Sequence, residues 1–235
     1  NKYLTNGIDA LVPKPYQVYE NWPYVQAIDE LRVEDRVPLT VKRIADLRLE
    51  ALASGNKVAI DALWMNYYST SSCIAYFVDQ IKIVPDCQIL TDVTPNSKTQ
   101  NGDVILTEQQ YNQLKGKTVQ CSDVILNKGL SRKQAKEHPV WQELLGDKLE
   151  PYTDALFKKY IDEGYIEPAG LHEALTGYKT KSDNFSKIMG VFVTDNMSIP
   201  TLHALAISAL FNGSILGNNY SPGNNIQFIG ELTKR

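Results

Sequence analysis

The sequence predicts an α+β protein, with helices in its first two thirds and strands towards its end. Two observations support this order. Apolar residues at helical spacing, framed by capping residues, recur as far as about residue 163. Runs of β-branched and aromatic residues then follow over 189–194, 202–210 and 226–232. The chain of 235 residues is long enough to bury a sizeable core, and it contains no internal repeat.

The first 39 residues differ in composition from the remainder. They are rich in proline and tyrosine, which favours extended chain with short turns over 1–38. We expect residues 1–39 to form an extended segment that packs through its aromatic side chains onto one domain spanning 40–235.

The first helix is predicted over 40–54. Thr40 is suited to the N-cap, apolar residues follow at helical spacing, and Gly55 stands where a C-terminal glycine belongs. The next stretch, 57–86, is rich in β-branched and aromatic residues and predicts strands. The polar stretch 91–103 is expected to be a loop.

Capping patterns predict the next helices. Thr107 and Ser131 each precede a glutamine by three residues, which is the arrangement of a capping box. Pro139 ends or bends the second of these helices and can begin a new one. A further helix is predicted over 150–163, followed by a loop over 164–186.

The C-terminal strands differ in their surroundings. Both faces of the 202–210 strand are apolar, which predicts a strand buried within a sheet. Residues 211–225 are dense in turn-forming residues, and 226–232 returns as a final strand.

The composition argues against several classes of function. A net charge of −3 and a pI near 5.7 argue against a nucleic-acid partner. No apolar run is long enough for a membrane span in this chain. The three cysteines lack metal-ligand spacing, so we expect free thiols, with a single disulfide as the alternative.

No catalytic constellation stands out, and we predict a non-enzymatic protein without a cofactor or metal. His138, His172 and His203 lie too far apart for a helical metal pair and are expected to be packing or surface residues. Trp22, Trp64 and Trp141 have apolar neighbours and are expected in the core. Phosphate loops, nucleophile elbows and paired carboxylates are all missing from the sequence.

The most informative feature is a charge-free stretch between Asp195 and Glu231. At the chain's charged fraction of 22%, a stretch of this length would hold about eight charged residues. It is rich in asparagine, serine and glycine, which offer hydrogen bonds, turns and apolar contacts instead of acid–base chemistry. These properties favour a binding surface.

Three C-terminal motifs carry a resemblance: Ile188-Met189-Gly190-Val191-Phe192, the run 202–207, and Phe228-Ile229-Gly230 after Gly223. With the block from His138 to Tyr160, they resemble the variable proteins of diversity-generating retroelements, particularly the archaeal type. The resemblance covers about 40–235 and implies a C-type lectin fold, related to formylglycine-generating-enzyme-like domains, with small antiparallel and mixed sheets flanked by helices.

In that family, a reverse transcriptase mutates template adenines and rewrites the C-terminal part of the gene. Asparagine codons of the template become many residue types but no stop codon. The resemblance implies a variable region at about 202–229 that binds an unknown protein or glycan. The implied ligand-binding residues are Ser208, Phe211, Asn212, Ile215, Asn218, Asn219, Tyr220, Ser221, Asn224 and Asn225.

Other readings stay open. The chain could be a C-type-lectin-fold binding or structural protein of a phage or cell surface that is not diversified. A formylglycine-generating-type enzyme fits less well, because no cysteine follows Cys121. A calcium-dependent lectin also fits less well, because calcium prefers carboxylates and 196–230 has none.

Overall fold

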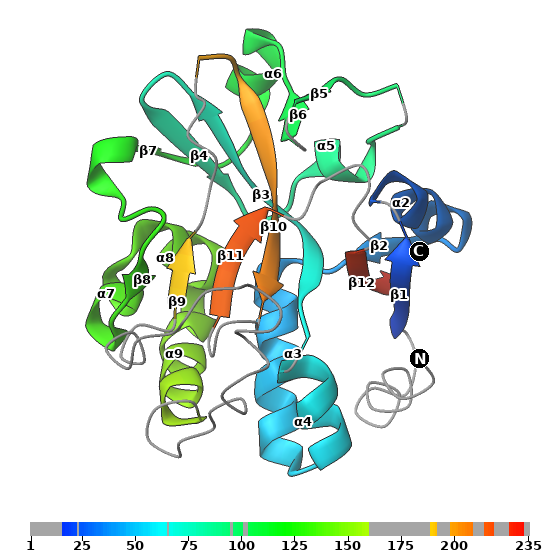
Figure 1. Cartoon of the computed structure of the whole chain (residues 1–235), viewed down its shortest axis with the longest axis vertical. Helices are drawn as coiled ribbons and strands as arrows, with labels where there is room; N and C mark the ends of the chain where they lie inside the picture. The colour runs from blue at the N-terminus through cyan, green and yellow to red at the C-terminus, as the bar shows by residue number, and fades with distance from the viewer. Residues whose placement is uncertain are drawn as a thin grey trace, which may run out of the picture.

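The computed structural model places one central sheet between helices (Figure 1). The structure describes residues 16–22, 24–64, 66–94, 96–100, 103–159, 189–191, 198–208, 214–218 and 226–232.

Strand β3 (Tyr68–Phe77) is the hub of the sheet. It pairs antiparallel with β10 (Thr201–Ser208) and β4 (Gln80–Val84), and parallel with β12 (Ile226–Leu232). The main strand order is β1-β12-β3-β10-β11-β9-β8. The other strands are β1 (Tyr16–Trp22), β2 (Arg36–Pro38), β5 (Thr99–Gln100), β6 (Asp103–Ile105), β7 (Lys117–Gln120), β8 (Gly129–Leu130), β9 (Met189–Val191) and β11 (Ser214–Asn218).

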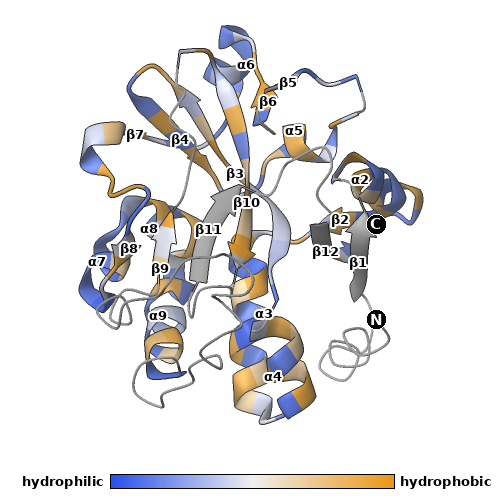
Figure 2. Cartoon of the chain, viewed as in Figure 1, coloured by the Kyte–Doolittle hydropathy of each residue, from blue (hydrophilic) through white to orange (hydrophobic). Residues whose placement is uncertain are grey.

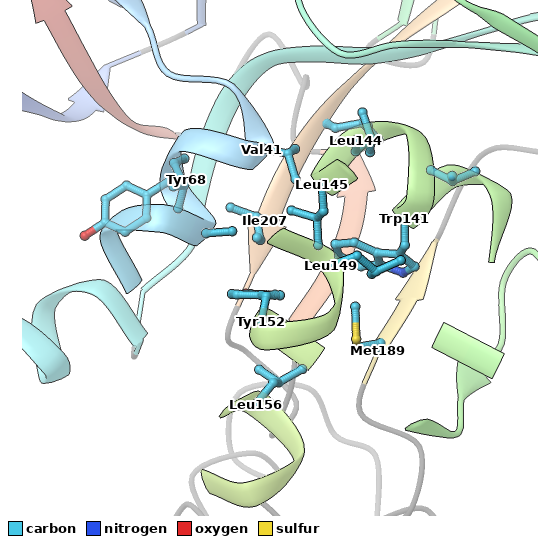
Figure 3. Packing of buried hydrophobic residues seen from close by; sticks show 14 of the residues in the cluster. Val41, Tyr68, Trp141, Leu144, Leu145, Leu149, Tyr152, Leu156, Met189 and Ile207 are labelled. Carbon is cyan, nitrogen blue, oxygen red and sulfur yellow. The ribbon is translucent and has the colours of Figure 1, made fainter. Parts of the chain in front are cut away.

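Both faces of the sheet are covered, so neighbouring residues of β3 and β10 enter different cores. One core joins the sheet to α3 (Val41–Ser54), α4 (Lys57–Trp64), α8 (Pro139–Leu145) and α9 (Leu149–Phe157), as Figure 3 shows for Trp141, Tyr152 and Ile207. The other core joins it to α2 (Tyr24–Val33), α5 (Gln88–Thr91) and α6 (Glu108–Gln113). The polar helix α7 (Arg132–Glu137) lies at the periphery (Figure 2).

The capping predictions are confirmed. Thr40 accepts a hydrogen bond from the Arg43 backbone amide at the start of α3, and Gly55 ends the helix with a φ of 65°. Thr107 and Ser131 form complete capping boxes at α6 and α7, and Pro139 begins α8. The buried strand predicted over 202–210 is β10 as far as Ser208, and the final strand predicted over 226–232 is β12.

The prediction of extended chain over 1–38 is wrong at Tyr24–Val33, which form α2. Tyr24, Ile28 and Leu31 recur at helical spacing and are buried in the second core, so tertiary packing outweighs the proline- and tyrosine-rich composition nearby. Strands β1 and β2, on either side of α2, both pair with β12. The division at residue 39 stays a prediction.

Three further stretches differ from expectation. Residues 57–64 form helix α4 instead of a strand, because Asn56 caps the Ala59 amide and Leu63 packs into the core. The expected loop over 91–103 contains β5 and the start of β6, which pair as a hairpin. The turn-rich stretch 211–225 contains β11, which gains its backbone hydrogen bonds from β10 and β9.

The expected 150–163 helix is α9 as far as Phe157, and the 189–194 strand is β9 as far as Val191. Residues 160–163, 192–194 and the 164–186 loop lie outside the described part of the chain.

Candidate ligand-binding site

Two strands of the predicted variable region, β10 and β12, meet the same residue of β3. Ala206 of β10 pairs with Ser69 in antiparallel register, and Phe228 of β12 pairs with Ser69 in parallel register on its other side. The chain between them pairs with β10 and β9 as β11 and then returns to the same end of β3 as β12. In Figure 1 this end lies beside α3 and α4.

The structure brings together two of the ten predicted site residues. Ser208 and Ile215 are direct partners across the β10–β11 pair, whereas Asn218 pairs with Leu205 at the other end of that pair. Ile215 and Asn218 are three positions apart in β11, so they occupy backbone positions of opposite faces. Phe211, Asn212, Asn219, Tyr220, Ser221, Asn224 and Asn225 lie outside the described residues.

Strand β3 bulges next to this site. Ser69 pairs with Ala206 and Cys73 pairs with Ala204, so three residues of β3 lie opposite the single residue Leu205. The Thr70 hydroxyl, which is fully buried, donates to the Leu205 carbonyl at 2.7 Å. This side chain supplies a cross-strand bond at the point where the regular ladder is interrupted.

Hydrogen bonds connect the same bulge to α3 and to the residue that follows β4. The Ser72 hydroxyl accepts a hydrogen bond from the Val41 amide at 3.0 Å and donates to the Pro85 carbonyl at 2.5 Å. The Ser71 amide donates to the Leu39 carbonyl at 3.0 Å. These bonds satisfy buried polar groups and fix the conformation of the bulge.

Below the last residues of β10, Arg48 of α3 is completely buried. Its guanidinium donates to the Leu63 carbonyl at 2.9 Å, the Asn66 carbonyl at 3.0 Å and the Tyr152 hydroxyl at 2.7 Å. A longer contact of 3.5 Å reaches the carbonyl of Ile207. One side chain thus joins α3, α4, α9 and the end of β10, because the guanidinium offers five donors in a fixed plane.

Aromatic rings surround this guanidinium. Trp64 stacks on Tyr152 with ring centroids 5.8 Å apart, and the Arg48 guanidinium carbon lies 5.7 Å from the centre of the Trp64 indole. The Trp64 indole donates to the Arg48 carbonyl at 2.9 Å, and the Tyr68 hydroxyl donates to the Ala62 carbonyl at 2.8 Å. Through the Ile207 carbonyl, the end of β10 therefore contacts a densely hydrogen-bonded cluster of side chains.

A buried polar pair lies further along β10. Nδ1 of His203 is 2.9 Å from Oδ1 of Asp103 on the neighbouring strand β6, and both residues are almost fully buried. The Tyr76 ring meets His203 edge-on at 6.0 Å. Burial, followed by the nearby Asp103 carboxylate, raises the pKa of Tyr76 well above its ordinary value. His203 is a core side chain, as predicted.

Other predicted packing residues also have their expected places. His138 is buried, with Nε2 2.9 Å from the Ile125 carbonyl, and this burial lowers its pKa. Trp64 and Trp141 are fully buried in the first core. His172 and the Trp22 side chain lie outside the described residues.

Sequence reasoning missed Arg48 and Thr70. Arg48 continues the apolar stripe of α3, four residues after Ile44, and a charged residue at a core-facing position was the available signal. Thr70 gave no comparable signal, because its role depends on the register between β3 and β10.

Two searches of the described residues found nothing. None of the helices in this part of the chain combines the length and apolarity needed to cross a bilayer. Within the same residues, histidine, cysteine and acidic side chains form no group of three that could hold a metal ion.

No protein-family model and no curated protein matches the sequence. A solved structure, described as "Accommodation of massive sequence variation in Nanoarchaeota by the C-type lectin fold", is similar to this chain with a TM-score of 0.67 and 17% identity. The similarity covers 94% of this chain and 99% of that one. It shows that this chain has a C-type lectin fold, as the sequence predicted.

Proposed function

We propose that this protein displays a ligand-binding surface whose residues are diversified by a retroelement, and that it acts without enzymatic chemistry. The surface consists of the ten residues predicted from the sequence, from Ser208 to Asn225. The ligand is a protein or a glycan, since a surface without charged side chains binds through hydrogen bonds, turns and apolar contacts.

One observation carries the proposal. Strands β10 and β12, which lie before and after most of the candidate surface, both pair with β3 at Ser69, in a fold that a solved neighbour is described as using to accommodate massive sequence variation. A fixed entry and exit allow the residues between them to change while the sheet stays intact. The bonds of Arg48 and Thr70 strengthen this support, because they hold the strand that leads into the segment.

Composition supports the same reading. Asparagine, serine and glycine are abundant in the segment, which also contains Tyr220, and binding loops of antibodies use the same residues. Tyrosine offers a large rigid contact surface, while asparagine and serine offer adaptable hydrogen bonds. Asparagine codons rich in adenine are also those that an adenine-mutating copy process would change.

A genetic experiment tests diversification directly. The DNA around the gene is sequenced for a near-copy of the variable region that differs only at adenines, next to a reverse-transcriptase gene. The gene itself is sequenced deeply from one cell population. We expect substitutions confined to the variable codons. A uniform gene without a template copy would overturn diversification and favour a C-type-lectin-fold protein with one fixed ligand or a structural role.

A stability experiment tests the proposed surface separately. Asn212, Asn219 and Asn224 are each changed to tyrosine, serine and aspartate, and the free energy of unfolding is measured in urea. We expect changes within about 0.5 kcal/mol, as for surface positions. Ile207→Asn is the matched control in the buried strand and should cost several times more. Losses above about 2 kcal/mol at the asparagines would contradict a tolerant binding surface.

A further inference from the structure

Two cysteines meet in the second core. Cys73 of β3 and Cys87 at the start of α5 are both almost completely buried in this core, and a hydrogen-bond interaction between their side chains shifts the pKa of both thiols. The backbone holds them in place from both sides. Cys73 pairs with Val84 of β4, and the Cys87 amide donates to the Ser71 carbonyl of β3 at 2.8 Å.

The two thiols differ in acidity. The hydrogen bond from Cys73 lowers the pKa of Cys87, aided by the backbone amides of Leu90 and Ile89. Burial raises the pKa of Cys73 well above its ordinary value, and its bond to Cys87 raises it further. Cys87 is therefore the thiol that ionises more readily and attacks a disulfide first. Cys73 is the thiol that then attacks the mixed disulfide, as in dithiols that exchange with disulfides.

We propose that Cys73 and Cys87 form a disulfide when the folding chain meets a low-molecular-weight disulfide, and that this crosslink stabilises the sheet beside the candidate site. It would connect β3, the hub of the sheet, to the segment that follows β4. The proposal concerns the opposite face of the sheet from Arg48 and holds whether or not the chain is diversified.

The exchange balances in two steps. The Cys87 thiolate attacks one sulfur of oxidised glutathione, which forms a mixed disulfide and releases one glutathione thiolate. The Cys73 thiol gives its proton to solvent and attacks the Cys87 sulfur, which forms the internal disulfide and releases the second glutathione thiolate. Two protein thiols are oxidised while one glutathione disulfide is reduced to two thiols.

Cys121 provides an internal control. It is only partly buried and packs against the first core, on the other face of the sheet from the pair. Burial and the nearby Asp79 carboxylate raise its pKa. Replacing it with serine leaves the Cys73–Cys87 pair as the sole source of an intramolecular disulfide.

The test refolds the full-length Cys121→Ser chain from denaturant in buffers of reduced and oxidised glutathione, so that access to the buried thiols does not limit exchange. Alkylation and intact mass then count the thiols. We expect both cysteines to be protected, the mass to fall by two hydrogen atoms, and one proteolytic fragment to link Cys73 to Cys87. Closing a loop of this length should raise the melting temperature by about 6–12 °C relative to the reduced chain.

Two variants complete the test. In Cys121→Ser combined with Cys87→Ser, or with Cys73→Ala should the first not fold, adding reductant should leave the melting temperature unchanged. Two alkylatable thiols at every glutathione ratio, or a stable glutathione adduct on Cys87, would overturn the proposal.

Discussion

The substitution Arg48→Met tests whether the buried guanidinium holds the support of the candidate site together. Methionine keeps the apolar stem of the side chain, so the change removes the donors and leaves little new cavity. Three acceptors, the buried Leu63 carbonyl and Tyr152 hydroxyl and the partly buried Asn66 carbonyl, lose bonds of 2.7–3.0 Å. A buried group left unsatisfied costs about 1–3 kcal/mol.

The three losses are not additive, because the Tyr152 hydroxyl can reorient and removing the charge also removes the cost of burying it. We therefore expect a loss of about 3–5 kcal/mol, in the lower half of the sum for three acceptors left without a donor. For a chain of this size the melting temperature should fall by about 10 °C. Urea unfolding followed by circular dichroism measures the loss, and an unchanged m-value shows that the denatured state is comparable.

Arg43→Met is the matched control on the same helix. The Arg43 guanidinium is one-third exposed and bonds the Glu50 carboxylate at 3.2 Å, so its loss should change stability by no more than about 1 kcal/mol. Equal effects of the two substitutions, or a loss below about 1 kcal/mol for Arg48→Met, would refute the role assigned to Arg48.

Three other predictions concern single residues. Val78 has a φ of 59° at the β3–β4 turn and is 63% exposed, so Val78→Gly should raise stability by about 1 kcal/mol in urea unfolding; a loss would show that its conformation is unstrained. Thr70→Val should cost about 1–3 kcal/mol, since the Leu205 carbonyl loses its donor, whereas Thr70→Ser should cost less; equal costs would exclude the hydroxyl as the cause. Burial lowers the pKa of His138, so the folded state resists protonation and loses stability as pH falls from the ordinary histidine value of about 6.5 towards the lower folded value. As the pH falls over this range, the melting temperature of His138→Gln should fall by less than that of the wild type. Equal falls in melting temperature would contradict this role of His138.

Local signals predicted the helices well where capping and periodicity agreed. Thr40, Gly55 and the boxes at Thr107 and Ser131 determine helix ends through their own hydrogen bonds, so the sequence alone contains the information. The strand prediction for residues 57–64 was wrong. Their β-branched residues favour a strand, but the Asn56 cap and packing against α3 stabilise a helix.

The support of the candidate site was harder to predict. Strand β11 lies in a turn-rich stretch, and its backbone hydrogen bonds go to β9 and β10. The residues of β11 themselves give no local sign of these partners. The contacts of Arg48 join residues up to 159 positions apart, and the role of Thr70 depends on a bulge. The C-type lectin fold was accessible from the C-terminal motifs, whereas the variable region stays a prediction.

The pairing of Ala206 and Phe228 with the same residue, Ser69, has a consequence for chain entropy. Two flanking strands lie about 10 Å apart across a shared neighbour, so the distance between the ends of the segment is set by the sheet. Extending a flexible loop between fixed ends costs only about 0.6 kcal/mol for each doubling of its length. Insertions of foreign sequence that leave β11 in register should therefore cost little stability, which makes this fold a candidate framework for peptide grafting.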